Sequence, residues 1–214
     1  MPVLAYIVVA VAAYLLGSIP TGFLVAKAKG IDIRAVGSGN IGATNAMRVL
    51  GKPAGIFVLL IDALKGWVAV RGLAFWIANN FFPYDSLGTT LEFCAVLAGI
   101  CVVIGHNYTC WLKFKGGKGI ATTAGVYLVL APWALLIALG VFILAVAITR
   151  YVSVGSIAAA IALPIGTFFT QSGLLVDVAT IVLGLLAIYK HKSNIQRLMS
   201  GTESRLGKKS EDAK

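Results

Sequence analysis

Two glycine-rich segments hold residue types that bind anions, and the first reads GSGNIGATNAMR from Gly37 to Arg48. Glycines allow backbone N–H groups to converge on an anion, and short hydroxyl and amide side chains add further donors. Arg48 supplies a positive charge that suits a phosphate. The composition favours an anion site over an ordinary turn between helices. The candidate ligands are Gly37, Gly39, Asn40, Thr44, Asn45 and Arg48, and Ser38 is a candidate catalytic residue.

The same segment contains the pattern G-x-G-x-x-G, which also occurs in dinucleotide-binding proteins. That fingerprint requires a buried strand before it and a βαβ unit around it. Here the pattern lies between two apolar stretches that are long enough for membrane helices. We therefore reject the dinucleotide-binding interpretation.

The second glycine-rich segment reads GHNYTCWLKFKGGKGIATT from Gly105 to Thr123. It is not a P-loop, because Leu112 stands where that motif needs a glycine. Its GGKG sequence precedes an apolar stretch, however, and the N-terminus of a helix favours a phosphate. A basic loop that binds lipid headgroups is the alternative for Lys113 and Lys115. The candidate ligands of this second anion site are Gly116, Gly117, Lys118 and Gly119.

Polar side chains also gather where later apolar stretches begin and end. Taken singly, a serine at a helix start is usually a cap, and a lone histidine at a membrane boundary is usually an interfacial residue. These residues are nevertheless expected on the same side of the membrane as the two glycine-rich segments. The further catalytic candidates are His106, Ser156 and His191, and the further substrate ligands are Ser153 and Asn194.

Seven apolar stretches must position these residues. Most of them approach the roughly 20 residues that cross the hydrocarbon core of a bilayer. We predict an all-α polytopic membrane protein with about seven transmembrane helices in a single domain, residues 1–195, and a basic, partly disordered cytoplasmic tail, residues 196–214. Asp62 and Lys65, three residues apart in the second stretch, are interpreted as a structural ion pair. The stretches are 3–25, 54–78, 88–104, 120–131, 133–149, 155–171 and 174–189.

The distribution of charge predicts the orientation of these helices. With the N-terminus outside and the C-terminus in the cytoplasm, nearly all of the 18 lysine and arginine residues lie on the inner side. The acidic residues Asp85, Glu92 and Asp177 fall in outer segments. This asymmetry agrees with the positive-inside rule. Both glycine-rich segments and both histidines then face the cytoplasm.

The overall composition excludes a soluble protein. Of 214 residues, 59% are hydrophobic and 12% are charged, and the mean hydropathy is +0.91. A soluble domain is roughly half apolar and about a quarter charged. The net charge of +10 is accounted for by cytoplasmic loops, so it requires no nucleic-acid partner.

Two anion sites on one face of a membrane suit a transfer between two phosphate-bearing molecules, one of them lipid-like. Carboxylates are too few for a magnesium-diphosphate enzyme, and no metal or cofactor is expected. The acyltransferase pair H-x-x-x-x-D is missing, because Trp111 and Gln196 occupy the second position after the two histidines. A small transporter or channel for organic phosphates and a non-enzymatic scaffold remain as alternatives.

The order of these segments resembles the bacterial acyl-phosphate:glycerol-3-phosphate acyltransferases, the PlsY family. At Thr109 the chain departs from the family pattern, which has a proline there. The matching segments cover nearly the whole chain: GSIPTGFLVAK from Gly17, GSGNIGATNAMR from Gly37, DALKG from Asp62, GHN from Gly105, FKGGKG from Phe114, the serines after Tyr151, and HKSNIQRLMSGTE from His191.

The resemblance implies an enzyme of phospholipid synthesis in the bacterial inner membrane, with its active site facing the cytoplasm. It implies transfer of a fatty acyl group from acyl phosphate to the 1-hydroxyl of glycerol 3-phosphate, giving lysophosphatidic acid and phosphate. The expected partners are these substrates, membrane lipid and the soluble enzyme that makes acyl phosphate. The acceptor of the hydroxyl proton is open among His106, His191 and the substrate's own phosphate. The residues implied to hold the glycerol phosphate or the transferring group are Ser38, Arg48, Lys118, Ser156, His191 and Asn194.

Overall fold

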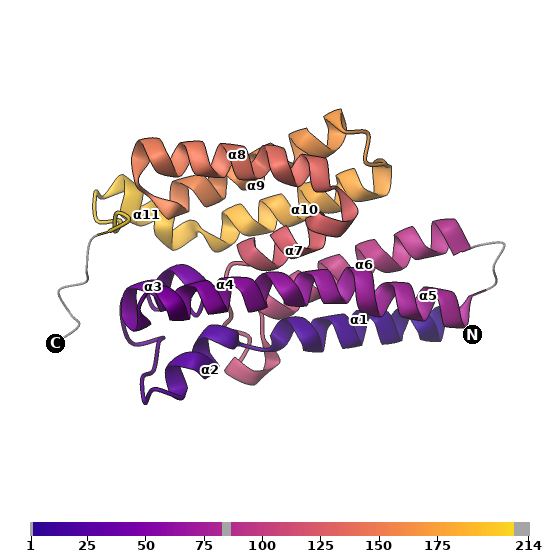
Figure 1. Ribbon diagram of the computed structural model, residues 1–214, viewed down its shortest axis with the longest axis horizontal. Coiled ribbons are helices and arrows are strands. Elements are labelled where there is room, and N and C mark those ends of the chain that lie inside the picture. The colour runs from indigo at the N-terminus through magenta and orange to yellow at the C-terminus, as the bar shows by residue number, and fades with distance from the viewer. Residues whose placement is uncertain (1, 83–86, 208–214) are drawn as a thin grey trace. The chain divides into compact units, whose positions relative to one another are not determined.

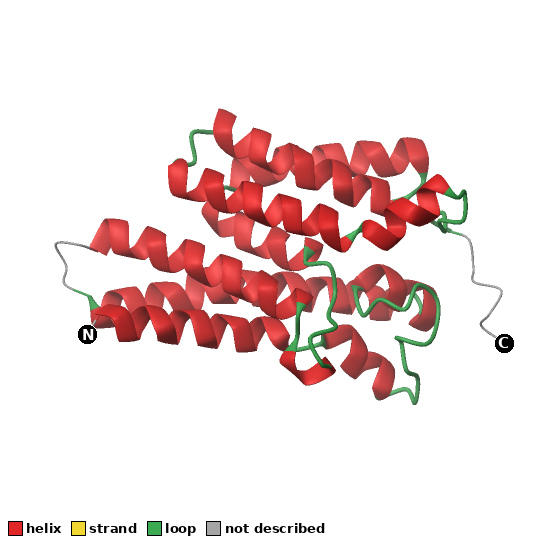
Figure 2. Ribbon diagram, turned by 180° about the vertical axis from the view of Figure 1, so that it is seen from behind, coloured by secondary structure: helices red, strands yellow, loops and turns green. Residues whose placement is uncertain are grey.

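The computed structural model describes residues 2–82 and 87–207, and these residues contain helices but no strand (Figures 1 and 2). This agrees with the predicted all-α class. The chain divides into two compact units, and the division in sequence falls between Leu130 and Ala131. One transmembrane domain over residues 1–195 stays a prediction.

The first unit contains helices α1 to α7. Helices α1 and α2 are separated at Ile19 and Pro20, where the proline ring removes a backbone donor that a continuous helix would use. Helices α4 and α5 are joined without a break by a π-helical segment, Val68–Ala74. The bounds are α1 Pro2–Ser18, α2 Thr21–Lys27, α3 Ala43–Leu50, α4 Lys52–Trp67, α5 Phe75–Phe81, α6 Leu87–Asn107 and α7 Ile120–Leu130.

Helix α1 packs against α6 (Figure 1). Glycines on both helices allow the two backbones to approach closely. A side chain at Gly17 would collide with the backbone of Val102, and one at Gly105 would collide with the backbone of Tyr14. The Tyr14 hydroxyl donates a hydrogen bond to the carbonyl of Tyr108 at 2.8 Å. These contacts hold the start of the second glycine-rich segment against α1.

Thr109, which replaces the proline of the family pattern, keeps a backbone that a proline could also adopt. Its φ is −63°, close to the value that a proline ring imposes. The buried Thr109 hydroxyl donates to the carbonyl of Ser18 at 2.5 Å. The threonine therefore adds a contact between α1 and the second segment that a proline could not make.

A small hydrophobic core lies beneath the first glycine-rich segment. It joins residues of α2, α3 and α4 to the loop that precedes α3 and to the second segment. Because these side chains are buried together, the loop is anchored on both sides of its glycines. The members of this core are Ala26, Ile33, Ile41, Ala46, Val58 and Leu112.

The second unit contains α8 Pro132–Thr149, α9 Val152–Phe169, α10 Leu174–Lys190 and α11 Lys192–Met199. Helix α9 packs against both α8 and α10. Helices α10 and α11 meet at an angle of 51°. In the segment predicted to be a tail, residues up to Met199 belong to α11, and Glu203 is buried. Residues 208–214 of that segment lie outside the described residues.

Every predicted apolar stretch is helical over most of its length. Five described helical runs are long and apolar enough to cross a membrane: Val3–Lys27, Lys52–Phe81, Gly88–Leu112, Pro132–Thr149 and Val152–Phe169. The bent pair of α10 and α11 can add a sixth, whereas α7 has only 11 residues. The count of seven crossings and their orientation stay predictions, and Asp85 lies outside the described residues.

Candidate functional site

The side chain of Asn45 forms hydrogen bonds with the backbone of the first glycine-rich segment. Its Oδ1 accepts a hydrogen bond from the backbone N–H of Ser38 at 2.9 Å. Its Nδ2 donates to the carbonyls of Asn40, Val36 and Ile33 at 2.9, 3.1 and 3.2 Å. Only 2% of Asn45 is exposed. The predicted ligand Asn45 therefore acts on the site through the position of Ser38.

Two glycines of this segment have backbone angles that other residues rarely adopt. The φ angle is +60° at Gly37 and +69° at Gly39. A side chain at Gly37 would also collide with Oδ1 of Asn45. Asn40 closes the turn, because its Oδ1 accepts from the N–H of Gly42 at 2.9 Å. The segment is thus a defined loop with a fixed path.

Thr44 and Arg48 follow this loop on α3. They are four residues apart, so their side chains share one face of the helix. Both are half-buried, and Gly42 precedes the helix in an extended conformation. The fold therefore presents these two predicted ligands directly after the glycine loop.

The second segment is fastened to the end of α6 by its backbone. The N–H of Gly117 donates to the carbonyl of His106 at 2.9 Å, and the N–H of Gly116 donates to the carbonyl of Asn107 at 3.2 Å. A Cβ at Gly117 would overlap Nε2 of the His106 ring. Gly117 must therefore be a glycine if the ring and the loop are to lie this close.

Lys118 stands between two buried glycines and is itself half-buried. Gly119 has a φ of +83°, and helix α7 begins at the next residue, Ile120. The sequence predicted that a helix begins directly after the GGKG sequence, and α7 begins there. Such a position favours an anion.

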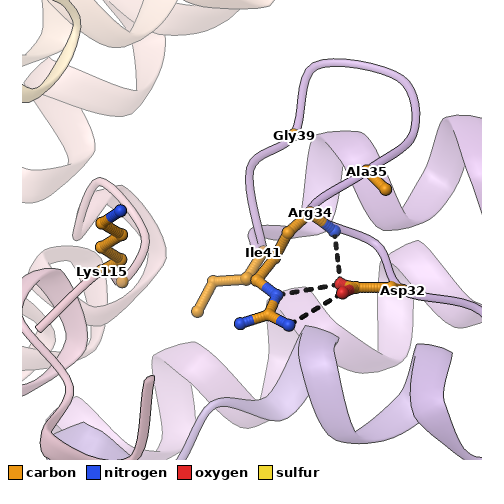
Figure 3. Close-up of a pocket in the computed structure, with 7 residues that line it drawn as sticks. Asp32, Arg34, Ala35, Gly39, Ile41 and Lys115 are labelled. Carbon is orange, nitrogen blue, oxygen red and sulfur yellow. Dashed lines mark hydrogen bonds and ion pairs between the residues drawn. The ribbon is translucent and has the colours of Figure 1, made fainter. Parts of the chain in front are cut away.

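One cavity of about 480 Å³ is lined by both glycine-rich segments (Figure 3). The first segment and the residues before it supply most of the lining, and Lys115 approaches from the second segment. Two of the predicted ligands, Gly39 and Gly116, are among its lining residues, so the two segments lie next to each other at this cavity. The lining residues are Asp32, Arg34, Ala35, Gly39, Ile41, Lys115 and Gly116.

Asp32 and Arg34 form an exposed ion pair at this cavity (Figure 3). The Arg34 side chain donates from Nε at 2.9 Å and from Nη2 at 2.8 Å. These hydrogen bonds lower the pKa of Asp32 to about 2, so its carboxylate stays charged at neutral pH and offsets Arg34. Neither residue was predicted to belong to the site, although their spacing of two in a polar loop suits such a pair.

His106 belongs to a buried polar cluster with Lys65 and Asp62. Its Nδ1 lies 2.8 Å from Nζ of Lys65, and Lys65 lies 2.9 Å from Oδ1 of Asp62. The hydroxyl of Thr21 also donates to that carboxylate at 3.0 Å. The ion pair predicted between Asp62 and Lys65 is therefore present, and it includes a histidine that the sequence could not place beside it.

In the second unit, Glu203 brings two predicted ligands together. Its Oε1 accepts from the Ser153 hydroxyl and from the Asn194 amide, both at 2.8 Å. Its Oε2 pairs with Nε of Arg197 at 2.7 Å. Burial raises the pKa of Glu203, but the hydrogen bonds from Asn194, Arg197 and Ser153 outweigh it and hold the pKa below its usual range. The carboxylate therefore stays charged at neutral pH.

Glu203 was not predicted to be a site residue. A usable signal existed, because Glu203 is the one acidic residue between Asp177 and Glu211, in a segment that is otherwise basic. A single acidic residue in such a segment is a natural partner for the nearby arginine. Its contact with Ser153 spans 50 residues of sequence and has no local pattern.

The remaining two candidates of the second unit bond to backbone carbonyls of helices: Ser156 lies within α9, and His191 lies directly after α10. The Ser156 hydroxyl donates to the carbonyl of Val152 at 2.9 Å. Nδ1 of His191 lies 2.7 Å from the carbonyl oxygen of Ala187. A carbonyl only accepts, so Nδ1 carries the proton and Nε2 is the acceptor of a neutral His191 ring.

Each unit therefore gathers part of the predicted set. The first unit holds Ser38, His106 and Arg48 with both glycine-rich segments, and the second holds one cluster built on Ser153 and Asn194. All of the latter cluster's predicted members are at least 90% buried, which restricts the directions from which a ligand could approach.

The chain is similar in sequence to one family of known proteins. The glycerol-3-phosphate acyltransferase family model matches residues 7–201. A glycerol-3-phosphate acyltransferase of Clostridioides difficile is 45% identical over 214 residues, covering 99% of this chain and 100% of that protein. One of Trichlorobacter lovleyi is 48% identical over 193 residues, covering 90% of this chain and 93% of that protein.

Two solved structures are also similar over both units. Both are of PlsY, an integral membrane glycerol 3-phosphate acyltransferase. The glycerol 3-phosphate form has a TM-score of 0.83 and 39% identity, and covers 94% of this chain and 96% of that chain. The lysophosphatidic acid form has a TM-score of 0.80 and 38% identity, with coverage of 94% and 95%.

Proposed function

The chain belongs to the glycerol-3-phosphate acyltransferase family of integral membrane enzymes, and from this premise we propose that its acyl donor is acyl phosphate. The acyl group is transferred to the 1-hydroxyl of glycerol 3-phosphate, and the products are lysophosphatidic acid and inorganic phosphate. The proposed location is the bacterial inner membrane, with the active site facing the cytoplasm. The soluble enzyme that makes acyl phosphate is a proposed partner.

The observation that carries this proposal is the cavity shared by the two glycine-rich segments. Both substrates of the proposed reaction carry phosphate, and each segment offers an environment that suits an anion. Reaction between two bound molecules requires their reactive atoms to approach within about 3–3.5 Å. A cavity lined by Gly39 of the first segment and by Gly116 of the second supports this arrangement, because two unrelated lipid-binding loops need not line a common cavity.

The proposed chemistry needs no enzyme nucleophile. The 1-hydroxyl oxygen of glycerol 3-phosphate attacks the acyl carbonyl carbon and forms the ester bond. The bond from that carbon to the phosphate oxygen breaks, and phosphate leaves with the electron pair. The hydroxyl proton passes to an acceptor, for which the acid-base groups of the site and the substrate phosphate are candidates. Because a mixed anhydride is a reactive acyl donor, positioning and charge neutralisation supply most of the catalysis.

The proposed roles follow the chemistry of each side chain. Arg48 and Lys118 bind phosphate through charge-assisted hydrogen bonds. The backbone of the GGKG sequence cradles the phosphate of one substrate, and Ser38 donates to the substrate next to the first loop. Contacts to the glycerol phosphate or the transferring group are proposed for Ser156, His191 and Asn194.

Phosphate release by the detergent-purified protein tests this function. We expect release from acyl phosphate that depends on glycerol 3-phosphate and is accompanied by stoichiometric lysophosphatidic acid. A transporter for organic phosphates would release none in detergent. Release of phosphate without lysophosphatidic acid would show hydrolysis and would contradict acyl transfer.

A further inference from the structure

We propose that Lys65 fixes His106 in its Nε2–H form, so that this ring donates a hydrogen bond toward the GGKG loop and does not serve as the general base. This inference rests on the proposed function for its catalytic meaning. The tautomer itself is a property of the first unit alone. It follows from how the buried donors and acceptors around Lys65 are matched.

The three hydrogens of the Lys65 ammonium have three partners within hydrogen-bonding distance. Nζ lies 2.9 Å from Oδ1 of Asp62, 3.2 Å from the carbonyl oxygen of Ile19 and 2.8 Å from Nδ1 of His106. An ammonium is a donor only. Each of the three partners must therefore accept, and for His106 this means that Nδ1 carries no proton.

The charges of the cluster lead to the same assignment. Lys65 and Asp62 are almost fully buried, with 4% and 3% of their side chains exposed, and they neutralise each other. A protonated His106 would add a second buried positive charge and would direct an N–H at the ammonium. In water, a lysine ammonium holds its proton far more tightly than an imidazolium does. The cluster is satisfied when Lys65 is charged and His106 is neutral.

Asp62 does not compete with Lys65 for the histidine. The distance from Oδ1 of Asp62 to Nδ1 of His106 is 3.7 Å, which is too long for a hydrogen bond. The same oxygen already accepts from Lys65 and from the Thr21 hydroxyl. Asp62 and Lys65 are therefore positioning residues that act through the ring of His106.

The other ring nitrogen faces the GGKG loop. A Cβ at Gly117 would overlap Nε2 of His106, and the Gly117 N–H is bonded to the His106 carbonyl. With Nδ1 accepting, a neutral ring carries its proton on Nε2. That N–H is suited to an oxygen of a phosphate held by the loop, where it would stabilise charge on the leaving group. The hydroxyl proton must then go to another acceptor.

Histidine NMR tests the tautomer without relying on activity. The chain contains two histidines, so selective ¹⁵N labelling gives two resolvable rings, and His106→Gln assigns them. At neutral pH, His106 is expected in the Nε2–H form and His191, which bonds Ala187 through Nδ1, in the Nδ1–H form. A His106 ring that is doubly protonated or in the Nδ1–H form would overturn the proposal.

The role of Lys65 is tested by removing both charges together, because Lys65→Met alone would leave the buried carboxylate of Asp62 without its counter-ion. In the Asp62→Asn, Lys65→Met double variant, His106 is expected to populate both tautomers. An unchanged Nε2–H signal in a folded double variant would show that Lys65 does not fix the ring. Failure of that variant to fold leaves the measurement on the parent protein decisive.

Two replacements of His106 separate a donor from a base. Glutamine places an amide N–H near the Nε2 position, whereas asparagine places one near Nδ1 and cannot reach the loop. We expect His106→Gln to keep turnover within about tenfold of the parent and His106→Asn to lose about ten- to hundredfold more. Equal, severe losses in both would indicate a general base. If the parent shows no turnover at all, the proposed function fails, while the NMR result still decides the tautomer.

Discussion

The side-chain oxygen of Asn45 accepts a hydrogen bond from the backbone N–H of Ser38 at 2.9 Å, across seven residues of sequence. A helical residue thereby sets the position of a predicted catalytic residue in the preceding loop. The same side chain holds three loop carbonyls through its amide. The loop therefore depends on one buried amide as well as on its glycines.

Replacing Asn45 should damage activity through the loop. Asn45→Ala leaves several buried backbone groups without partners, at a cost of about 1–3 kcal/mol each before relaxation, so we expect at least a tenfold loss of catalytic efficiency and lower stability. Asn45→Asp keeps the acceptor for Ser38 but turns a buried carboxylate oxygen toward the three carbonyls, so it should be at least as damaging. Activity and thermal unfolding are measured together. Full activity of Asn45→Ala would contradict this role.

Removing Arg48 or Lys118 should weaken phosphate binding. Each variant, Arg48→Ala or Lys118→Ala, loses a charge-assisted contact worth about 1.5–3 kcal/mol, so catalytic efficiency should fall at least tenfold. Steady-state kinetics with varied glycerol 3-phosphate and varied acyl phosphate would show which substrate each residue holds. Lys113→Ala is the control, because Lys113 is exposed in the same loop. An equal effect in the control would indicate general surface charge instead of a site.

Glu203→Ala should destabilise the second unit. The change leaves Ser153, Asn194 and Arg197 without their shared acceptor, and we expect a loss of about 2 kcal/mol or more. Thermal unfolding in detergent measures it. Glu203→Gln keeps the shape but removes the charge, so it should be less damaging. An unchanged unfolding temperature in both variants would rule out the cluster as a stabilising element.

The same carboxylate predicts a pH dependence of stability. The folded pKa of Glu203 is below its ordinary value of 4.5. Its stabilising contribution is therefore complete above pH 4.5 and is lost as the pH falls through the folded pKa. The unfolding temperature of the parent should drop more steeply in this acid range than that of Glu203→Gln. Parallel curves would contradict the assignment.

The proposed orientation is tested with single cysteines after Cys94, Cys101 and Cys110 are replaced. Cysteine at position Ser172, between α9 and α10, should react with an impermeant reagent from outside the cell. Cysteine at Ser200, after α11, should react only once the membrane is opened. Labelling of both positions from the same side would show that α10 does not cross as proposed.

Local patterns in the sequence were sufficient to predict the long apolar helices and the loop residues that could bind an anion. Apolar length predicted the long helices but not the short polar helices α3 and α11, which lie outside the predicted apolar stretches. Gly, Ser and Asn with a nearby charge predicted an anion-binding loop in the first segment. The break at Pro20 follows from the proline itself, but the π-helical segment at Val68–Ala74 has no comparable signal. Such local signals report on residues within a few positions of one another.

Contacts between residues that are far apart in the sequence could not be predicted from such local signals. The contact of Lys65 with His106 spans 41 residues, and that of Ser153 with Glu203 spans 50. Both depend on how helices pack, which composition and periodicity do not describe. The sequence therefore identified Lys65 as part of an ion pair without showing that the pair reaches a histidine of the site.

The acyl donor is the central claim, and a direct comparison of donors tests it best. Acyl phosphate, acyl-coenzyme A and acyl-carrier protein would be supplied at equal concentration with glycerol 3-phosphate to the same detergent-purified protein. A thioester is a weaker acyl donor, and its carriers need a docking surface larger than the short loops offer. We expect lysophosphatidic acid from acyl phosphate at a rate more than tenfold above either thioester. Turnover with either thioester within tenfold of acyl phosphate would contradict the account.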